Sequence, residues 1–287
     1  MKSKHVLISI GTFAILFAAY WWFGHPFFKE GREVMFISIV SLSSIILYYI
    51  AEANNGAKIF LRAIPGLKAF EEAVGRSTEM GRSVLFVPGI MDMDQVETVA
   101  GVTILGHVSK MTAQYETPLE VPVSRAIVME ASREIVKESY LSQGRPDLYN
   151  DSMIHYLTDD QFAYAAGVDG IMLREKPAAC FYQGKFYAES LILAETGNSI
   201  GAIQIAGTAS QAQIPFFVTT CDYTLIGEEF LTASAYLSQK PSLLGSIKGQ
   251  DVGKLIIMIA ILFTVVFNAF HDLGWVQYDI KQFFTAN

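Results

Sequence analysis

Acidic and polar side chains follow several segments that have the length and composition of buried strands. Asp92 and Asp94 come soon after SVLFVPG, and Ser124 and Arg125 end PLEVPVSR. The carboxyl ends of parallel strands share one edge of a sheet, where α/β proteins bind ligands, so these residues mark a candidate site. Carboxylate oxygens there could hold Mg²⁺ or Ca²⁺. The candidate ligand-binding residues are Asp92, Asp94, Ser124, Arg125, Asp159, Asp160 and Asp222.

The same acids also suit a structural role. Asp side chains accept hydrogen bonds from the free amides of a first helical turn, and their charge complements the helix dipole. Each of these acids stands where a helix is expected to begin. Capping is therefore the favoured interpretation and ligand binding is the alternative. No catalytic residue is assigned, and no cofactor or metal is predicted.

The usual signatures of two common enzyme classes are not recognised in the sequence. Neither a zinc hydrolase nor a serine hydrolase is expected from the sequence. Gly197 and Gly201 have a spacing that could suggest a phosphate loop, but they lie between a helix end and a strand start. A helix carboxyl end repels anions, so Gly197 is expected to cap the helix FYAESLILAE instead.

Three uncharged apolar runs predict membrane-spanning helices. Val6–Phe23 has 18 residues, Val34–Ile50 has 17 and Leu255–Phe270 has 16. These lengths are near the lower limit of about 17 residues for a spanning helix. The first run has the alternative of a signal peptide, which the poor cleavage site in LFAAYWWF disfavours. Lysines and arginines near the run ends place the amino terminus and the long middle region in the cytoplasm.

Small and polar residues recur along two of these runs. Such residues let helices approach closely and form hydrogen bonds in lipid. Their partners lie either within one chain or between chains. The candidates for helix contact or oligomerisation are Ser38, Ser41, Ser44, Ala260, Thr264 and Asn268.

The middle region alternates strand-like and helix-like segments. SVLFVPG and PLEVPVS are expected strands, each followed by helical spacing. MIHYLT, AIQIAG and PFFVTT are expected as further strands. Right-handed crossovers between such strands predict one α/β domain with a Rossmann-like parallel sheet.

The sequence also predicts three local details of this region. Thr158 or Asp159 caps the helix DDQFAYAAG, and CDYTLIGEEFLTASAYLSQK forms the last helix. The segment GIMLREKPAACFYQG is either a helix end followed by a strand or a hairpin. The sequence leaves both readings of that segment open.

Several long segments of the sequence resemble a known family. They include LKAFEEAVGRSTEMGRSVLFVPG, DDQFAYAAGVDGIMLREKPAA and FYAESLILAETGNSIGAIQIAGTA. The region from Leu67 to Lys254 resembles an uncharacterised family of bacterial membrane proteins known only as a domain of unknown function. The resemblance implies a bacterial membrane protein with no assigned reaction, so it transfers no catalytic residue.

These observations predict three parts of the chain. Residues 1–52 contain two transmembrane helices, residues 53–251 form the cytoplasmic α/β domain, and residues 252–287 form a third transmembrane helix and a short outward tail. The domain has 15 basic and 23 acidic residues, which disfavours nucleic-acid binding. The expected function is a scaffold or complex subunit in the bacterial inner membrane. Its expected partners are the lipid bilayer and further copies of the chain in a homo-oligomer or membrane complex; a membrane-bound enzyme or small-ligand receptor is the alternative.

Overall fold

The computed structural model of the chain describes residues 33–57, 59, 64 and 66–273, together with Gly11, Ile15 and Ala18. The chain divides into two compact units. Arg62–Ser238 is the α/β unit, and Met1–Leu61 with Gln239–Asn287 is the helical unit. The predicted first span, Val6–Phe23, lies outside the described residues apart from the three positions named above, and so does most of the predicted outward tail.

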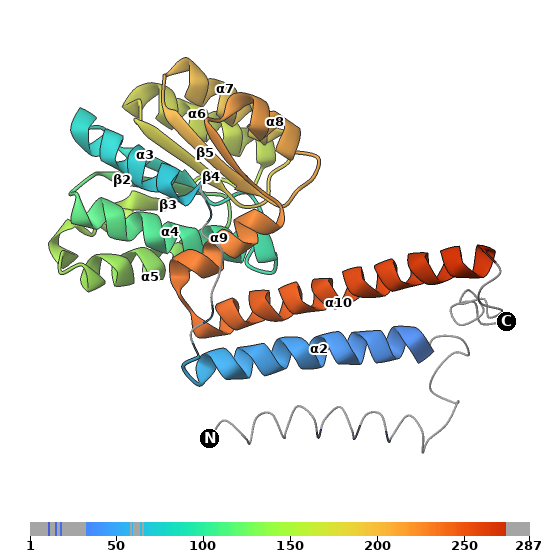
Figure 1. Cartoon of the computed structure of the whole chain (residues 1–287). Coiled ribbons are helices and arrows are strands. Elements are labelled where there is room, and N and C mark those ends of the chain that lie inside the picture. The colour runs from blue at the N-terminus through green and yellow to red at the C-terminus, as the bar shows by residue number, and fades with distance from the viewer. Residues whose placement is uncertain are drawn as a thin grey trace. The chain divides into compact units, whose positions relative to one another are not determined.

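The α/β unit is built on a parallel sheet of six strands (Figure 1). Their order is β3-β2-β1-β4-β5-β6, so the chain builds outward from β1 in one direction and then restarts on its other side with β4. All neighbouring pairs are parallel. This confirms the predicted α/β class and parallel sheet. The strands are β1 (Val84–Val87), β2 (Leu119–Val123), β3 (Ile154–Tyr156), β4 (Ala179–Gln183), β5 (Ile203–Thr208) and β6 (Tyr223–Ile226).

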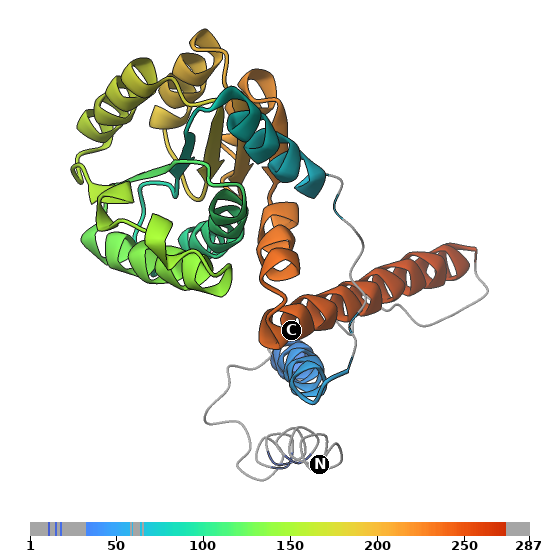
Figure 2. The same ribbon diagram turned by 90° about the vertical axis from the view of Figure 1, so that its left-hand side faces the viewer.

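Helices cover both faces of the sheet, as Figure 2 shows from the side. One face packs against α3 (Leu67–Met80), α4 (Val96–Gln114), α5 (Ala126–Ser142) and α9 (Glu228–Ser238). The other face packs against α6 (Gln161–Glu175), α7 (Glu189–Ser199) and α8 (Ile214–Thr220). Two short 3₁₀ turns, Pro146–Leu148 and Asp151–Met153, connect α5 to β3.

The two faces of the sheet bury separate apolar cores. Phe181 lies between Phe70 and Phe86, with ring centroids 5.1 and 6.1 Å apart. On the opposite face, Tyr182 stacks on Phe217 at 5.9 Å. All five rings are fully buried, which anchors both helix layers to the central strands β1 and β4.

Most of the predicted elements form where the sequence places them. The helix from Leu67 ends at Met80, and Gly81 adopts the left-handed conformation that ends it (φ 62°). The helix-end reading of GIMLREKPAACFYQG is correct, because α6 ends at Glu175 and β4 begins at Ala179. The cap of α6 is Asp160, whose Oδ1 accepts from Ala163 N at 2.8 Å, and not Thr158 or Asp159.

Three expectations about the second half of the domain are wrong. PFFVTT is not a strand but the helix α8, which has Pro215 in its first turn. The expected last helix contains the edge strand β6 before α9 begins at Glu228. Gly197 does not cap α7, because the helix continues to Ser199. A side chain at Gly197 would overlap Gln204 and Tyr182, so this glycine lets α7 approach the sheet.

The helical unit contains two long antiparallel helices, α2 (Glu33–Asn54) and α10 (Pro241–Asp272), which lie side by side (Figure 1). Among the described residues these are the two helices long and apolar enough to cross a membrane, over Met35–Asn54 and Pro241–Phe270. The predicted domain 53–251 extends past the α/β unit, since α10 begins at Pro241 and belongs to the helical unit.

Three glycines of α10 fix how the two helices meet. Gly245, Gly249 and Gly253 follow one another at intervals of four residues. A Cβ would lie 2.5 Å from Tyr49 O at Gly245 and 2.6 Å from Ile46 Cα at Gly249, and would overlap the Leu42 side chain at Gly253. Such small residues allow close packing of helices in a membrane.

Candidate functional site

The loops after β1 and β2 are tied together through one backbone carbonyl. Ser124 Oγ and Arg125 Nε both donate to Ile90 O, at 3.1 and 3.2 Å. Arg125 Nη1 also lies 3.9 Å from Asp159 Oδ2. The structure therefore brings Ser124, Arg125 and Asp159 to one edge and gives the first two a part in holding the loop after β1. Their role in binding a ligand stays a prediction.

The other candidate acids at this edge form local hydrogen bonds. Asp92 Oδ1 accepts from Met93 N at 2.7 Å, and the Asp92 carbonyl accepts from Gln95 N at 3.2 Å. Asp94 Oδ2 accepts from the Gln95 side chain at 3.2 Å. Asp160 caps α6. Of these three acids, only Asp160 makes the helix cap expected from the sequence. Asp92 and Asp94 do not cap α4, which begins at Val96 without a side-chain cap, and their hydrogen bonds stay within the preceding turn.

Asp222 lies at the opposite edge of the sheet. Its Oδ2 accepts from Gln204 N at 2.8 Å, near the beginning of β5. The expectation that Asp222 shares an edge with Asp92 is wrong because PFFVTT forms α8. The chain returns along that helix, so Asp222 precedes β6 instead of following a strand.

The strand order reverses between β1 and β4, and ligands of open α/β sheets bind at such a point. Here the two loops meet through their backbones. Ile90 N donates to Lys185 O at 3.1 Å. A Cβ at Gly89 would lie 2.6 Å from Lys185 O, and one at Gly184 would lie 2.5 Å from Pro88 O. The two loops therefore touch through their backbones at the reversal point, where neither glycine leaves room for a side chain.

Beside this point lies the one buried charged residue among those the structure describes, Glu189 in the first turn of α7. Its Oε1 accepts from Tyr187 N at 2.8 Å and its Oε2 accepts from Gln161 Nε2 at 2.6 Å. Both carboxylate oxygens thus have a protein donor. Nearby, Lys185 Nζ donates to Gln95 Oε1 at 3.0 Å. Glu189 and Lys185 are the polar groups of this edge that the sequence reasoning missed.

The position of Lys185 and the burial of Glu189 could be predicted only from the strand order and the helix packing. Lys185 follows β4, but only the pairing of β4 with β1 places it at the reversal point. Glu189 has the sequence of an ordinary acid at a helix start, and its full burial comes from the packing of α6 against α7. Neither property is carried by local sequence.

The sequence does contain the spacing G-x-S-x-G, in GNSIG from Gly197 to Gly201. The serine nucleophile of α/β-hydrolases stands on a turn from a strand into a helix. Ser199 stands instead at the end of α7, before β5, and its Oγ donates to Thr196 O at 2.7 Å. This structural context argues against the serine-hydrolase class.

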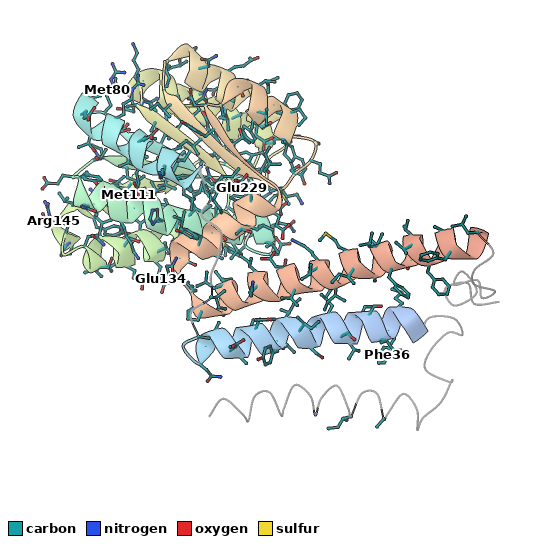
Figure 3. The ribbon with its side chains drawn as sticks, viewed as in Figure 1. Phe36, Met80, Met111, Glu134, Arg145 and Glu229 are labelled. Carbon is teal, nitrogen blue, oxygen red and sulfur yellow. The ribbon has the colours of Figure 1, made fainter. Side chains whose placement is uncertain are left out.

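The two cysteines are not reactive, and the described part of the chain holds no cluster of metal ligands. Burial raises the pKa of the Cys180 and Cys221 thiols to about 12, so both stay protonated near neutral pH. Among the described residues, no three His, Cys, Asp or Glu side chains come close enough to hold a metal ion. The most connected ion pairs lie elsewhere, where Arg145, labelled in Figure 3, contacts Glu116 and Asp147.

The candidate helix-contact residues fall into two groups. Ser38, Ser41 and Ala260 line a groove of about 380 Å³ between α2 and α10, together with Leu42 and Gly253. Ser44 and Thr264 instead donate to the carbonyls of Val40 and Ala260 within their own helices, both at 2.8 Å. Asn268 lies in the last turns of α10. A role of these residues in oligomerisation stays a prediction.

Comparison with known families identifies most of the chain. The model of DUF6754, a domain of unknown function, matches residues 24–278. The chain belongs to the DUF6754 family. This confirms the resemblance to a family of unknown function. No curated protein and no solved structure matches the chain.

The DUF6754 chain therefore presents two distinct kinds of surface. At the carboxyl edge of its sheet, hydrogen bonds within the chain use Ser124, Arg125 and Glu189. Along α10, large apolar side chains such as Met258 and Leu262 are more than 60% exposed. The first surface can position loops, and the second requires a bilayer or a protein to cover it.

Proposed function

We propose that this protein is a membrane-anchored scaffold or complex subunit that assembles laterally through its spanning helices and its α/β unit. The observation that carries the proposal is the contrast between the two surfaces. The polar groups of the sheet edge are engaged within the chain, whereas the outer side of α10 is apolar and uncovered over several turns. An exposed apolar surface of this kind marks a site of association.

The membrane and the orientation of the chain in it are also part of the proposal. We infer a bacterial inner membrane, more than one pass and an α/β unit on the cytoplasmic side. The excess of lysine and arginine at one end of the apolar runs supports that orientation. Reporter fusions at residues 57 and 273 test it, since the two ends should report from opposite sides of the membrane.

Lateral assembly is tested by the mass of the purified full chain. Native mass spectrometry and light scattering in lipid nanodiscs should give a defined multiple of the 31.7 kDa chain. Particles that contain one copy and no other protein, at every protein-to-lipid ratio, would contradict the proposal. Assembly that persists after dilution would support it.

The second candidate function is a membrane-bound enzyme or small-ligand receptor. The reversal of strand order beside Lys185 and the buried Glu189 favours this candidate. Thermal-shift measurements with Mg²⁺, Ca²⁺ and nucleotides test it, repeated on Asp92→Asn, Asp94→Asn and Lys185→Met. A shift in the wild type that these variants abolish would favour the enzyme or receptor over the scaffold.

A further inference from the structure

The three most exposed large apolar side chains among the described residues of the α/β unit lie at one edge of its sheet. Val96, Ile127 and Phe162 are 67%, 62% and 59% exposed. They stand at the first or second position of α4, α5 and α6, the helices that follow β1, β2 and β3. These three strands are neighbours and parallel, so their helices begin at the same carboxyl edge. We call Val96, Ile127 and Phe162 the apolar rim.

Contacts between loops hold the apolar rim in place. Arg125, which precedes α5, donates to Ile90 O and pairs with Asp159. Lys185 donates to the side chain of Gln95, which precedes α4. A surface that is ordered before binding loses less conformational entropy when a partner covers it. The apolar rim is therefore suited to bind another protein.

The apolar rim lies among acidic side chains. Asp94, Asp159 and Asp160 stand in the loops that lead into α4 and α6, and all three are exposed. Arg125 and Lys185 already form contacts within the chain. The edge therefore repels anionic lipid, nucleic acid and a second edge of its own kind. Its partner must offer cations beside apolar side chains.

The amino edge of the same sheet offers that combination. Ala178 N donates to Ser83 O at 3.0 Å, which joins the segments before β1 and β4. Arg82 and Lys176 stand in these two segments, close to this bond. Both are exposed, and neither side chain has a hydrogen bond or ion pair in the part of the chain that the structure describes. Two cations are thus available to an acidic partner.

Apolar side chains accompany these cations. Met80, labelled in Figure 3, ends α3 and is 43% exposed, and Leu173 lies in the last turn of α6 and is 57% exposed. Residues 79–82 and 173–176 together hold three bases and two acids. The amino edge therefore differs in charge from the carboxyl edge. We call Met80, Arg82, Leu173 and Lys176 the amino-edge patch.

We propose that the apolar rim of one copy, with its acids, packs on the amino-edge patch of a second copy. This inference rests on the lateral assembly proposed above and names its partner and its surfaces. The two surfaces are different parts of the chain, so the contact is head-to-tail and each copy keeps one edge of each kind for a further neighbour. Repetition about an axis along the membrane normal closes such a contact into a ring.

The two kinds of residue contribute differently to this contact. Burial of the apolar rim against the amino-edge patch supplies the affinity, since removal of apolar area from water is the favourable term. Exposed ion pairs add little free energy each, but they fix orientation and exclude partners of like charge. The acids beside the rim and the cations of the patch therefore set the head-to-tail direction.

The direction of the contact is tested by crosslinking two variants of the full chain. Ile127→Cys and Leu173→Cys, with tags of different mass, are reconstituted together in lipid nanodiscs and treated with a short bis-maleimide. We expect the mixed pair to crosslink roughly tenfold more than either variant alone, because a head-to-tail contact joins unlike edges. Val218→Cys in α8, exposed to a similar extent at 52%, replaces Leu173→Cys as the matched control. The wild type controls for Cys180 and Cys221.

The charges are tested in the same mixed pair. Asp94→Lys with Asp159→Lys in the chain with the rim cysteine should lower the mixed crosslink roughly tenfold, since like charges then face each other. Arg82→Glu with Lys176→Asp in the chain with the patch cysteine should restore most of it. Restoration by changes on the other chain excludes a merely local structural effect, and circular dichroism checks that each variant keeps its fold.

Two failures are distinguishable. If the wild type is oligomeric but the mixed pair crosslinks no better than Ile127→Cys alone or the Val218→Cys control, the inference is wrong and lateral assembly stands. The same conclusion follows if the charge reversals leave the yield unchanged. If the wild type exists as single copies in nanodiscs, the proposed function fails together with the inference.

Discussion

The α2–α10 pair and the α/β unit both use glycine to bring backbones together, yet they bury apolar side chains to very different extents. In the α/β unit, Phe70, Phe181 and Tyr182 are fully buried on the two faces of the sheet. In α10, Leu262 and Val265 are 65% and 61% exposed. The α/β unit thus has an apolar core of its own, whereas the helix pair depends on its surroundings for most of its apolar burial.

The sharpest test of the α/β unit is Gly101→Ala in α4. A Cβ there would overlap the backbone oxygen of Gln183 at the end of β4, and backbone cannot move away as a side chain can. We expect a loss of about 3 kcal/mol or more in the free energy of unfolding, which is the upper range for overpacking. Chemical unfolding followed by tyrosine fluorescence and far-UV circular dichroism measures it, because the three tryptophans of the chain lie outside the α/β unit.

Gly75→Ala in α3 is the matched control for this prediction. A Cβ at Gly75 meets nothing within 4 Å, so the change should stabilise the helix by roughly 0.5–1 kcal/mol. Equal effects at Gly75 and Gly101 would show that the contact with Gln183 does not limit the packing of α4.

The corresponding test of the helix pair is Gly249→Val. A Cβ at Gly249 would lie 2.6 Å from Ile46 Cα, so the two helices must separate. We expect a loss of about 1–3 kcal/mol, smaller than at Gly101 because two helices in lipid can shift apart. A disulfide between Leu42→Cys and Gly253→Cys should form in the parent chain and fall in yield when Gly249→Val is added.

A smaller effect is expected at the start of α6. Asp160→Ala removes the side-chain oxygen that accepts from Ala163 N, and loss of such a cap costs about 1 kcal/mol. Asp159→Ala, next to it but outside the cap, should cost less because its ion pair with Arg125 is long and exposed. Thermal unfolding of the two variants side by side measures the difference, and the reverse order would contradict the capping role.

The smallest expected effect is a pH dependence from His107 in α4. Burial, followed by nearby Lys110, lowers the pKa of His107 below its usual value of 6.5. The unfolded chain then binds a proton more readily than the folded chain, so stability is lost as pH falls from 6.5 toward the lowered pKa. His107→Gln should flatten this part of the stability curve, and an unchanged slope would assign the dependence to other groups.

The sequence predicts the first half of the α/β unit well for identifiable reasons. The helix from Leu67 to Met80 has an amphipathic spacing and a terminal glycine, and both signals are local. PFFVTT misleads because a short run of aromatic and β-branched residues does not distinguish a buried strand from a short helix. The edge strand β6 is only four residues long and precedes a helix directly, so its signal is lost in that of α9.

Only part of the candidate site could be predicted from the sequence. Ser124, Arg125 and Asp159 could be placed at one edge because parallel strands share their direction. Lys185 and Glu189 could not, since their positions depend on which strands pair and which helices pack together. The three glycines of α10 are visible in the sequence as G-x-x-x-G-x-x-x-G, but their register against α2 is a property of the folded pair.

The separation of α2 from α10 along the chain has a consequence for biosynthesis. About 190 residues lie between Asn54 and Pro241, and a ribosome adds roughly 5–20 residues per second. If both helices insert into a bilayer, as the proposed function requires, the first does so roughly 10–40 s before its glycine-bearing partner is translated. During that interval the groove-lining side of α2 has no partner helix from its own chain. An insertion factor or another nascent chain therefore has time to shield it.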